Sequence, residues 1–501
     1  MASTRSSSSQ PQSSSASLDV VIIGGGIMGL CTAYHLLTSQ PQLSSTSTVT
    51  LIENSRSCQI ANGASSKAGG FIARDWHKNQ STFNLAQLSW ECHQQMSLDL
   101  DGQTTYGWQT VPAIGFRVGG DNQQSRSKYR QLPNETKNET GFNWLNHGDK
   151  QDLTNGKGGA QAGIAQIDPA QFCQTVYRHL SLDHRFKTVF GTPESLSSKH
   201  NLLTVRSTID SNRTTTLPVS KLVITAGPWS SIVCRQLGLP EIELTNLPGH
   251  SLLIKPALRH VVAAGGTGVV AASSVSPLSI TRQDIGIEPV AIFAGIGSDA
   301  AMGVEHATGG TGRLLTEREQ QMGYTEAPEL FTRLNGIVYV AGENTTPNST
   351  NSSDSTATPP VAPNRLPDNV DDVDGLRDDN LLSRLIKSAE AVSPLLQQSR
   401  GAIITARQAS CSLTLTLLLC YRPKTFDGEC MIGPLCDNVY IATGHGPWGI
   451  TLAPGTGKLV SEMILNSTLS ANIPLLSAER FKKSNLTQTS NNQSTLPLAR
   501  L

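Results

Sequence analysis

The sequence predicts an α/β protein in which a parallel sheet is combined with an added antiparallel sheet. A β-branched run at 20–23 is followed by a glycine-rich turn, a helix-like stretch to about residue 37 and a second strand-like run at 48–52. This is the order of a βαβ unit. Later apolar runs mix alternating and continuous patterns, as a mixture of antiparallel and parallel strands does. These runs are 202–205, 222–225, 338–341 and 439–443.

The composition narrows the functional classes. The 501 residues suffice for two or three domains, and 39 Lys plus Arg balance 39 Asp plus Glu. A neutral chain without a basic stripe gives no electrostatic reason to expect a nucleic-acid partner. The longest apolar stretch, 413–419, is far shorter than the roughly 20 residues that a membrane span requires. The nine cysteines include no C-x-x-C pair, so we expect free thiols and no metal site.

The most informative motif is a G-x-G-x-x-G pattern directly after the first strand. Gly24 permits a tight turn, Gly26 lets a pyrophosphate approach the backbone, and Gly29 allows close packing of helix on strand. The helix start offers N–H groups and partial positive charge to phosphates. Glu53, at the end of the next strand, is placed to bind ribose hydroxyls, which favours NAD or FAD over NADP. The residues assigned to this end of the site are Gly24, Gly26, Ile27, Met28, Gly29, Glu53 and Asn54.

The glycine motif alone does not separate NAD from FAD, and a plain glycine-rich turn beside a surface glutamate is the alternative. Further segments add to it: NGASSKAGGFI at 62–72, IDP at 167–169, VITAGPWS at 223–230, YRPKTFDG at 421–428, IGP at 432–434 and IATGHGPWGIT at 441–451. Together they resemble the FAD-dependent D-amino-acid oxidase, glycine oxidase and sarcosine oxidase family, in a fungal and plant-like branch. The resemblance covers most of residues 19–465 and is patchy in 101–163 and 261–320.

The resemblance implies a Rossmann-like FAD-binding domain of the GR2 type and a second, antiparallel-sheet substrate domain. We expect the FAD domain at 19–100, 165–245 and 425–470, and the substrate domain at 101–164 and 246–424. We expect disorder or flexibility in three polar segments. They are the N-terminal tail 1–18, an insertion at 344–380 and the C-terminal tail 471–501.

The resemblance also assigns flavin contacts outside the glycine motif. The loop 62–72 runs beside the flavin, and 445–451 lies along its ribityl chain and pyrimidine edge, where helix-start N–H groups stabilise the charge of reduced flavin. A plain strand-to-helix turn is the alternative for 445–451. Lys67 is either a charge that assists oxygen or a surface lysine. The assigned contacts are Ser65, Ser66, Lys67, Gly70, Phe71, Ile72, Ala226, Gly227, His445, Gly446, Pro447, Trp448, Gly449, Ile450 and Thr451.

Arg422 is the candidate for the substrate carboxylate, because the family's Arg-Pro-x-Thr turn holds this group and guanidinium matches carboxylate bidentately. An arginine that braces a loop is the alternative. Glu329 is a second catalytic candidate, from the stretch that lines the pocket in relatives. Cys420 stands at the spacing of the flavin-linked cysteine of sarcosine oxidases, so it is either a covalent flavin link or a small buried thiol. The aromatic hydroxyl of glycine oxidase-like pockets is not identified in this sequence.

One departure from the family pattern concerns these candidates. The family runs Gln-Ala-Cys-Tyr-Arg-Pro without a break, whereas here an apolar stretch at 410–420 separates Gln408-Ala409 from Tyr421. A gene-model error would explain it. A genuine insertion would put the positions of Cys420 and Arg422 in doubt.

The resemblance implies an oxidoreductase that oxidises the C–N bond of a small amine or amino acid by hydride transfer to FAD, with oxygen as acceptor and peroxide as product. The alternatives are a dehydrogenase that passes electrons to another carrier, a tRNA-modifying flavoprotein and a non-catalytic flavoprotein. The C-terminal Ala499-Arg500-Leu501 resembles the Ser-Lys-Leu peroxisomal signal. We therefore expect a peroxisomal or cytoplasmic protein.

Overall fold

The computed structural model describes most of the chain. The described residues are 17–38, 43–118, 142, 144–146, 148–154, 156–197, 199–256, 287–297, 324–333, 335–344, 366–376, 380–400, 402–405 and 418–481. The stretch 410–417 and the C-terminal 499–501 lie outside these residues, and so do the predictions made for them. Among the described helices, none has the length and apolar character needed to span a bilayer.

An eight-stranded sheet forms around the first strand. Its five central strands β8, β2, β1, β11 and β20 are parallel, and antiparallel strands extend both edges. In spatial order the strands are β10 (Thr214–Pro218), β9 (Leu202–Ser207), β8 (Phe186–Ser197), β2 (Thr48–Glu53), β1 (Asp19–Ile23), β11 (Lys221–Ile224), β20 (Val439–Thr443) and β19 (Met431–Cys436). The predicted βαβ unit is therefore confirmed, and runs about 400 residues apart in sequence share one sheet.

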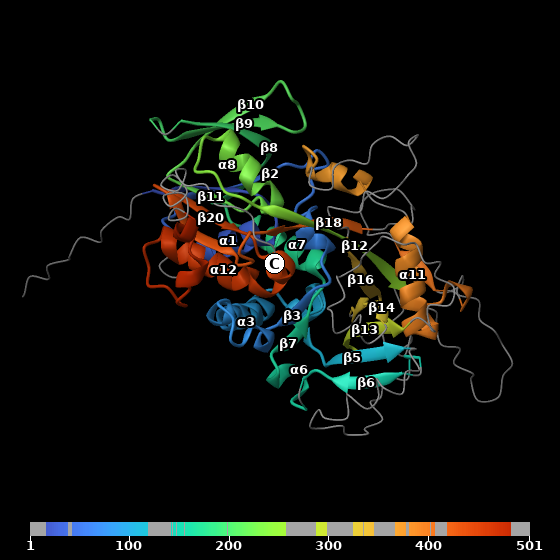
Figure 1. Cartoon of the computed structure of the whole chain (residues 1–501). Helices are drawn as coiled ribbons and strands as arrows, with labels where there is room; N and C mark the ends of the chain where they lie inside the picture. Colours follow the sequence, from blue (N-terminus) through green and yellow to red (C-terminus); the bar gives the residue numbers. More distant parts are fainter. Residues whose placement is uncertain are drawn as a thin grey trace, which may run out of the picture.

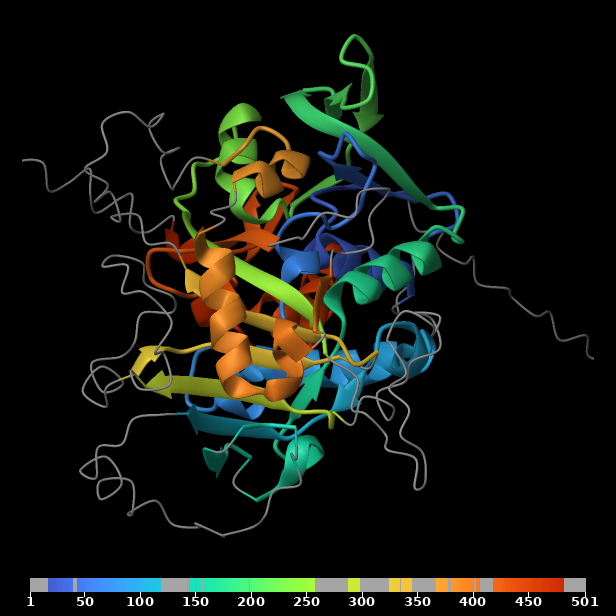
Figure 2. The ribbon, with the colours of Figure 1, turned by 90° about the vertical axis from the view of Figure 1, so that its right-hand side faces the viewer.

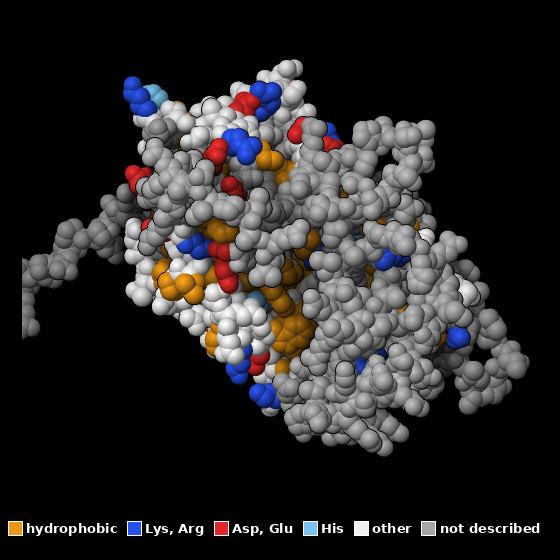
Figure 3. Space-filling model, viewed as in Figure 1, with side chains coloured by type: hydrophobic (Ala, Val, Ile, Leu, Met, Phe, Trp, Pro, Cys, Tyr) orange, Lys and Arg blue, Asp and Glu red, His pale blue; other side chains and the backbone are white. Residues whose placement is uncertain are grey.

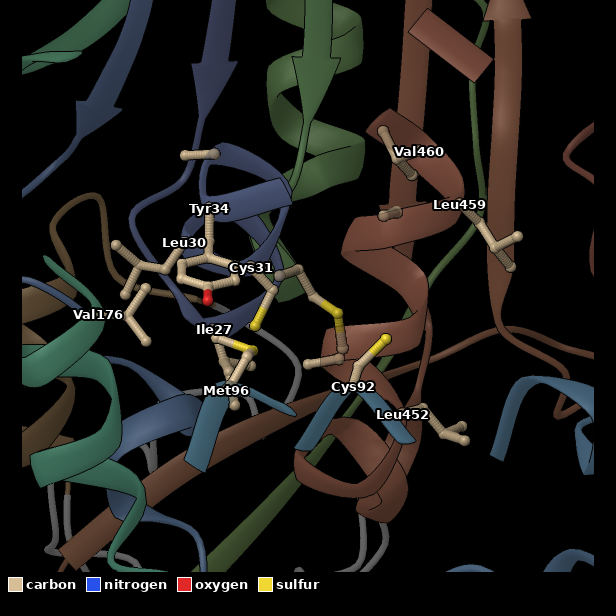
Figure 4. Close-up of a cluster of buried hydrophobic side chains, with 14 of the residues drawn as sticks. Ile27, Leu30, Cys31, Tyr34, Cys92, Met96, Val176, Leu452, Leu459 and Val460 are labelled. Atoms are coloured by element: carbon tan, nitrogen blue, oxygen red, sulfur yellow. The ribbon is translucent and has the colours of Figure 1, made fainter. Parts of the chain in front are cut away.

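Helices bury one face of this sheet. They are α1 (Ile27–Thr38), α3 (Phe83–Asp99), α7 (Pro169–Leu180) and α12 (Gly449–Ile464). Figure 4 shows their apolar side chains meeting in one cluster, with Leu30 of α1, Met96 of α3 and Val460 of α12 all buried. A Cβ at Gly457 would lie only 2.5 Å from the backbone of Cys31, so α12 packs on α1 with backbone nearly in contact.

A second sheet of nine strands lies beside the first (Figure 1). Its pairings are antiparallel except for β5 with β13, so the predicted α/β fold with an added antiparallel sheet is confirmed. Its strands are β5 (Ala113–Val118), β6 (Asp149–Asp152), β12 (Thr245–Lys255), β13 (Ala291–Gly297), β14 (Tyr324–Glu326), β15 (Glu329–Thr332), β16 (Val338–Asn344), β17 (Ile403–Thr405) and β18 (Leu418–Lys424). Helix α11 (Asn380–Val392) crosses one face of it (Figure 2) and buries Leu385 and Ala389.

A third, small sheet has three antiparallel strands. It consists of β3 (Phe71–Ala73), β7 (Ile164–Gln166) and β4 (Gln109–Thr110). After β7, Asp168 caps α7 with Oδ1, which accepts from the Ala170 N–H at 2.9 Å. The other oxygen of Asp168 accepts from Nη1 of Arg333 at 2.8 Å, and the two side chains are 16% and 7% exposed. This ion pair ties the turn between β15 and β16 to the start of α7.

The remaining elements are short. They are α2 (Ala64–Lys67), α4 (Gly102–Thr105), α6 (Gly158–Gln161), α8 (Ser230–Gln236), η1 (Asp75–His77), η2 (Gly227–Trp229), η4 (Val370–Leu376), η5 (Pro394–Leu396), η6 (Gln398–Arg400), η7 (Gly446–Trp448) and η8 (Pro474–Leu476). The division into domains stays a prediction.

Two segments expected to be disordered or flexible are partly ordered. Residues 366–376, inside the expected insertion, form η4 and bury Val373. Residues 471–481 contain η8 and bury Leu476 and Ala478, while Arg480 pairs with Asp427 at 2.8 Å. The expectation was wrong for these two stretches, because scattered apolar residues in polar surroundings suffice to fix a segment once a partner surface exists.

We predict that Arg333→Ala lowers the free energy of unfolding by about 3 kcal/mol, because it leaves a mostly buried carboxylate without its cation. Urea unfolding followed by circular dichroism measures this. Arg206→Ala is the matched control, since the Arg206 side chain is 55% exposed in its pair with Glu194 and such pairs contribute less than about 1 kcal/mol. Equal effects of the two substitutions would contradict the bridging role of Arg333.

Candidate active site

A cavity of about 510 Å³ lies between the two large sheets. This volume is within the usual range for sites that bind cofactors and small molecules. Its walls include the glycine turn after β1, the loop around η7 and residues of the second sheet. The chain brings these segments together because β11 pairs in parallel with both β1 and β20, so all three strands end at one edge of the sheet.

The glycine turn has the geometry that the motif requires. Gly24 has a φ of +114°, which a residue with a side chain rarely adopts. A Cβ at Gly29 would lie 2.1 Å from the carbonyl oxygen of Gly24, so only glycine permits α1 to start this close to β1. Gly24, Gly26, Ile27 and Met28 line the cavity at the N-terminus of α1, where N–H groups attract anions.

Glu53 ends β2 at the cavity wall, as predicted. Its Oε2 accepts from the Gly25 N–H at 2.8 Å, and the residue is only 8% exposed. Burial raises the pKa of Glu53 to about 7, against the opposing effect of hydrogen bonds from the Gly25 and Asn54 N–H groups. A carboxylate that is buried against a cavity is suited to take hydroxyl donors from a ribose.

The loop around η7 forms the other end of the cavity. Gly444 and Gly446 have φ values of +79° and +53°, which turn the chain from β20 into η7. His93 holds the following turn, with its Nε2 2.9 Å from the carbonyl oxygen of Ile450. Helix α12 then begins without a side-chain cap, and Gly449 and Ile450 at its start line the cavity.

His445 is buried at this loop and its Nε2 lies 3.1 Å from the Thr456 hydroxyl. Burial lowers the pKa of His445 to about 3, so the ring is neutral at physiological pH. The contact with Thr456 gives His445 a structural role at the start of this loop. His250, on β12, lines the cavity and is also buried.

The polar groups that line the cavity suit a dinucleotide with a reducible ring. A glycine cradle at a helix start suits a pyrophosphate, and Glu53 suits a ribose. At the other end, the uncapped start of α12 suits the charge of a reduced flavin. One cavity joins both ends.

The predicted cofactor residues fall into two groups. Those that line the cavity are Gly24, Gly26, Ile27, Met28, Glu53, Asn54, Ser65, Gly70, Phe71, Ala226, Gly227, His445, Gly446, Pro447, Trp448, Gly449 and Ile450. Those outside its described lining are Gly29, Ser66, Lys67, Ile72 and Thr451. Within the second group, Thr451 donates to the carbonyl of Phe71 at 3.3 Å, and Ile72 is fully buried in the core.

The position of Lys67 contradicts one of the two alternatives that were predicted for it. A surface lysine was expected as one alternative, but the side chain is 1% exposed and its Nζ lies 2.7 Å from Oδ1 of Asp374. Ser65 acts at the glycine turn, where its hydroxyl oxygen accepts from the Ile27 N–H at 2.9 Å. The loop 62–72 is thus fixed both to the glycine turn and to η4.

The substrate candidates lie at the second-sheet side of the cavity. Cys420 and Arg422 alternate on β18 and both line it, as does Glu329 on β15. Cys420 and Arg422 lie in the second sheet, since β18 pairs with β12 over seven residues. Burial raises the pKa of the Cys420 thiol, although Arg422 and Lys67 act in the opposite direction.

Tyr339 was missed in the sequence. It lies on β16 opposite Phe331, lines the cavity and donates its hydroxyl to the carbonyl of Lys67 at 3.2 Å. Alternation along β16 could have found it, because Val338 and Val340 face the core under α11 and Tyr339 therefore faces the opposite side.

An aromatic wall covers this part of the cavity. Phe71 stacks on Phe331 with ring centroids 5.4 Å apart, and Trp76 lies 5.0 Å from both Phe71 and Phe293. The ring of Trp448, from the loop around η7, lies with its centroid 6.4 Å from that of Trp76. Figure 3 shows hydrophobic side chains gathered in the middle of one molecular face, while charged side chains are scattered over it. The wall gives the cavity a largely apolar lining.

Comparison with known proteins identifies the family. The family model described as FAD dependent oxidoreductase (DAO) matches residues 19–281 and 326–463. The candidate oxidoreductase C1F5.03c of Schizosaccharomyces pombe is 26% identical over 489 residues, which cover 93% of this chain and 99% of the relative.

Solved structures share the fold. Glycine oxidase from Geobacillus kaustophilus is 15% identical with a TM-score of 0.55, over 92% of this chain and 98% of that chain. L-alpha-Glycerophosphate oxidase from Mycoplasma pneumoniae, solved with FAD bound, is 15% identical with a TM-score of 0.52, over 91% and 97%. Since the family model matches well over half of the sequence, the chain belongs to the DAO family of FAD-dependent oxidoreductases.

Proposed function

We propose that this protein oxidises the C–N bond of a small amine or amino acid and transfers the electrons to oxygen. The observation that carries the proposal is that Arg422 lines the same cavity as the glycine turn and the η7 loop. A guanidinium there binds a carboxylate, and the aromatic wall accommodates an apolar part of the substrate. When bound in the cavity, FAD would supply the acceptor for a hydride from the carbon that bears the nitrogen.

The surrounding residues bind and orient rather than exchange protons. Burial lowers the pKa of His445 to about 3 and raises that of Tyr339 far above neutrality, so neither changes charge near pH 7. Hydride transfer requires a held substrate and a water-poor environment more than a strong base. The aromatic wall keeps the environment poor in water, and Arg422 helps to hold the substrate. Glu329, which also lines the cavity, is proposed to contact the amine of the substrate.

The test of this function is direct. We expect purified protein to be yellow, to lose its visible absorbance when it is mixed without air with an amino acid or secondary amine that it accepts, and to release peroxide in air. Bleaching without peroxide would instead support a dehydrogenase. A yellow protein that no member of the panel bleaches would support a non-catalytic flavoprotein. Acid precipitation separates a covalent link at Cys420, which keeps the colour in the pellet, from a free cofactor.

Arg422→Ala is predicted to lower kcat/KM for carboxylated substrates about 100-fold, because it removes a charge-assisted hydrogen-bonding partner. The flavin spectrum stays unchanged. Lys424→Ala is the matched control, since it removes the same charge from the same strand at an exposed position. If a substrate and its decarboxylated analogue lose rate equally in Arg422→Ala, the carboxylate role is wrong.

FAD affinity is predicted to rise about tenfold from pH 6 to pH 8 through Glu53. Without cofactor the Glu53 pKa is about 7, whereas ribose hydroxyls donate to the ionised form and lower this pKa. Below pH 7, FAD binding therefore releases a proton from Glu53. Well above pH 7, Glu53 is already ionised and the affinity no longer rises with pH. Fluorescence titration of apoprotein measures the Kd. In Glu53→Gln the rise should vanish, and an unchanged slope would rule out this group.

A further inference from the structure

Residues 366–376 form a segment that we call the strap. It is the unlabelled orange helical piece above β18 in Figure 1, and it comes from the polar stretch between β16 and α11. Three of its residues, Pro367, Asp368 and Val370, line the cavity. They do so beside Glu53 and Asn54, at the nucleotide end.

The strap is fixed to the residue that follows Glu53. The Asn54 side chain donates to the carbonyl of Asp368 at 2.8 Å and accepts from the Asn369 side chain at 3.0 Å. The Asn54 carbonyl also accepts from the Val370 N–H at 3.4 Å. Asn54 was predicted as a cofactor contact; its polar groups hold the strap over the end of β2.

Asp371 is the central anchor of the strap. Its carboxylate accepts from the Ser57 N–H and the Asn62 side chain, both at 2.8 Å, and from the Ser55 hydroxyl at 3.1 Å. Burial would raise its pKa, but the hydrogen bonds from Ser57, Asn62 and Ser55 hold the Asp371 pKa below the usual value. The carboxylate is therefore charged at physiological pH and bound to three residues of one loop.

Both ends of the strap are fastened as well. At one end the indole N–H of Trp229 donates to the carbonyl of Pro367 at 2.8 Å. At the other, Asp374 pairs with the buried Lys67 at 2.7 Å. Leu366 and Val373 of the strap pack with Leu419 and Tyr421 of β18. Polar and apolar contacts thus fix the strap along its whole length.

We infer that the strap is a wall of the FAD site that covers the adenosine half of the cofactor and controls its exchange. Glu53 marks where the ribose lies, and the strap lines the cavity immediately beyond it. FAD then enters and leaves at this end only when the Asp371 and Asn54 contacts open. The inference rests on the cofactor of the family and not on the proposed substrate.

The experiment compares Asp371→Ala with Asp372→Ala. Asp372 is the matched control, because it lies next to the anchor and its ion pair with Arg56 is exposed, with side chains 47% and 55% accessible. Purified holoprotein is diluted and the recovery of flavin fluorescence gives the rate of FAD release. We expect release about tenfold faster or more for Asp371→Ala, which loses three donors to a charged acceptor, and a change below about twofold for Asp372→Ala.

Equal release rates for wild type, Asp371→Ala and Asp372→Ala would overturn the inference. If Asp371→Ala does not fold, Trp229→Phe removes one strap hydrogen bond and keeps the ring, and its release should still exceed that of the control. If acid precipitation shows covalent flavin, Cys420→Ser is added to every variant. Hydrogen exchange is a second readout: bound FAD should protect the amides of 366–376 in wild type more than in Asp371→Ala. None of these measurements requires a substrate, so a failed activity screen leaves the result unaffected.

Discussion

The parallel pairing of β1 with β2 and β11, continued to β20, is the constraint on which the site depends. Parallel strands present their carboxyl ends at one edge of a sheet, so the turn after β1, Glu53 after β2 and the loop after β20 converge without further guidance. Gly24 and Gly29 are required because the helix starts almost in contact with the strand. Residues of the second sheet form further walls of the cavity at this edge.

The parts of the fold that could be predicted are those encoded locally. The strand-glycine-helix order, the acid at the end of the next strand and the Asp168-Pro169 helix start each describe their own structure within a few residues. The site residues at the glycine turn follow from the same signals, whereas those at the C-terminal loop were assigned through the family resemblance, and most of both groups line the cavity. Their assignment to FAD contacts stays a prediction.

What could not be predicted depends on partners distant in sequence. Lys67 has no local mark of burial, because the carboxylate that permits it, Asp374, lies about 300 residues away in a stretch whose composition suggests disorder. The anchoring of Asp371 has the same origin, since its donors all belong to 55–62. Tyr339 is different: its strand was predicted, and strict alternation would have indicated its face. Composition describes a segment by itself, whereas the environments of Lys67 and Asp371 are set by partners that are distant in sequence.

The near contact between Gly457 and Cys31 has a consequence for biosynthesis. Helix α1 is made long before α12, the helix that seals its apolar face. During translation the glycine turn therefore emerges about 400 residues before α12, and the pocket for the coenzyme is completed only when α12 has been made. Contacts this distant in sequence slow folding, so the apolar face of α1 stays exposed to solvent until α12 is available to cover it.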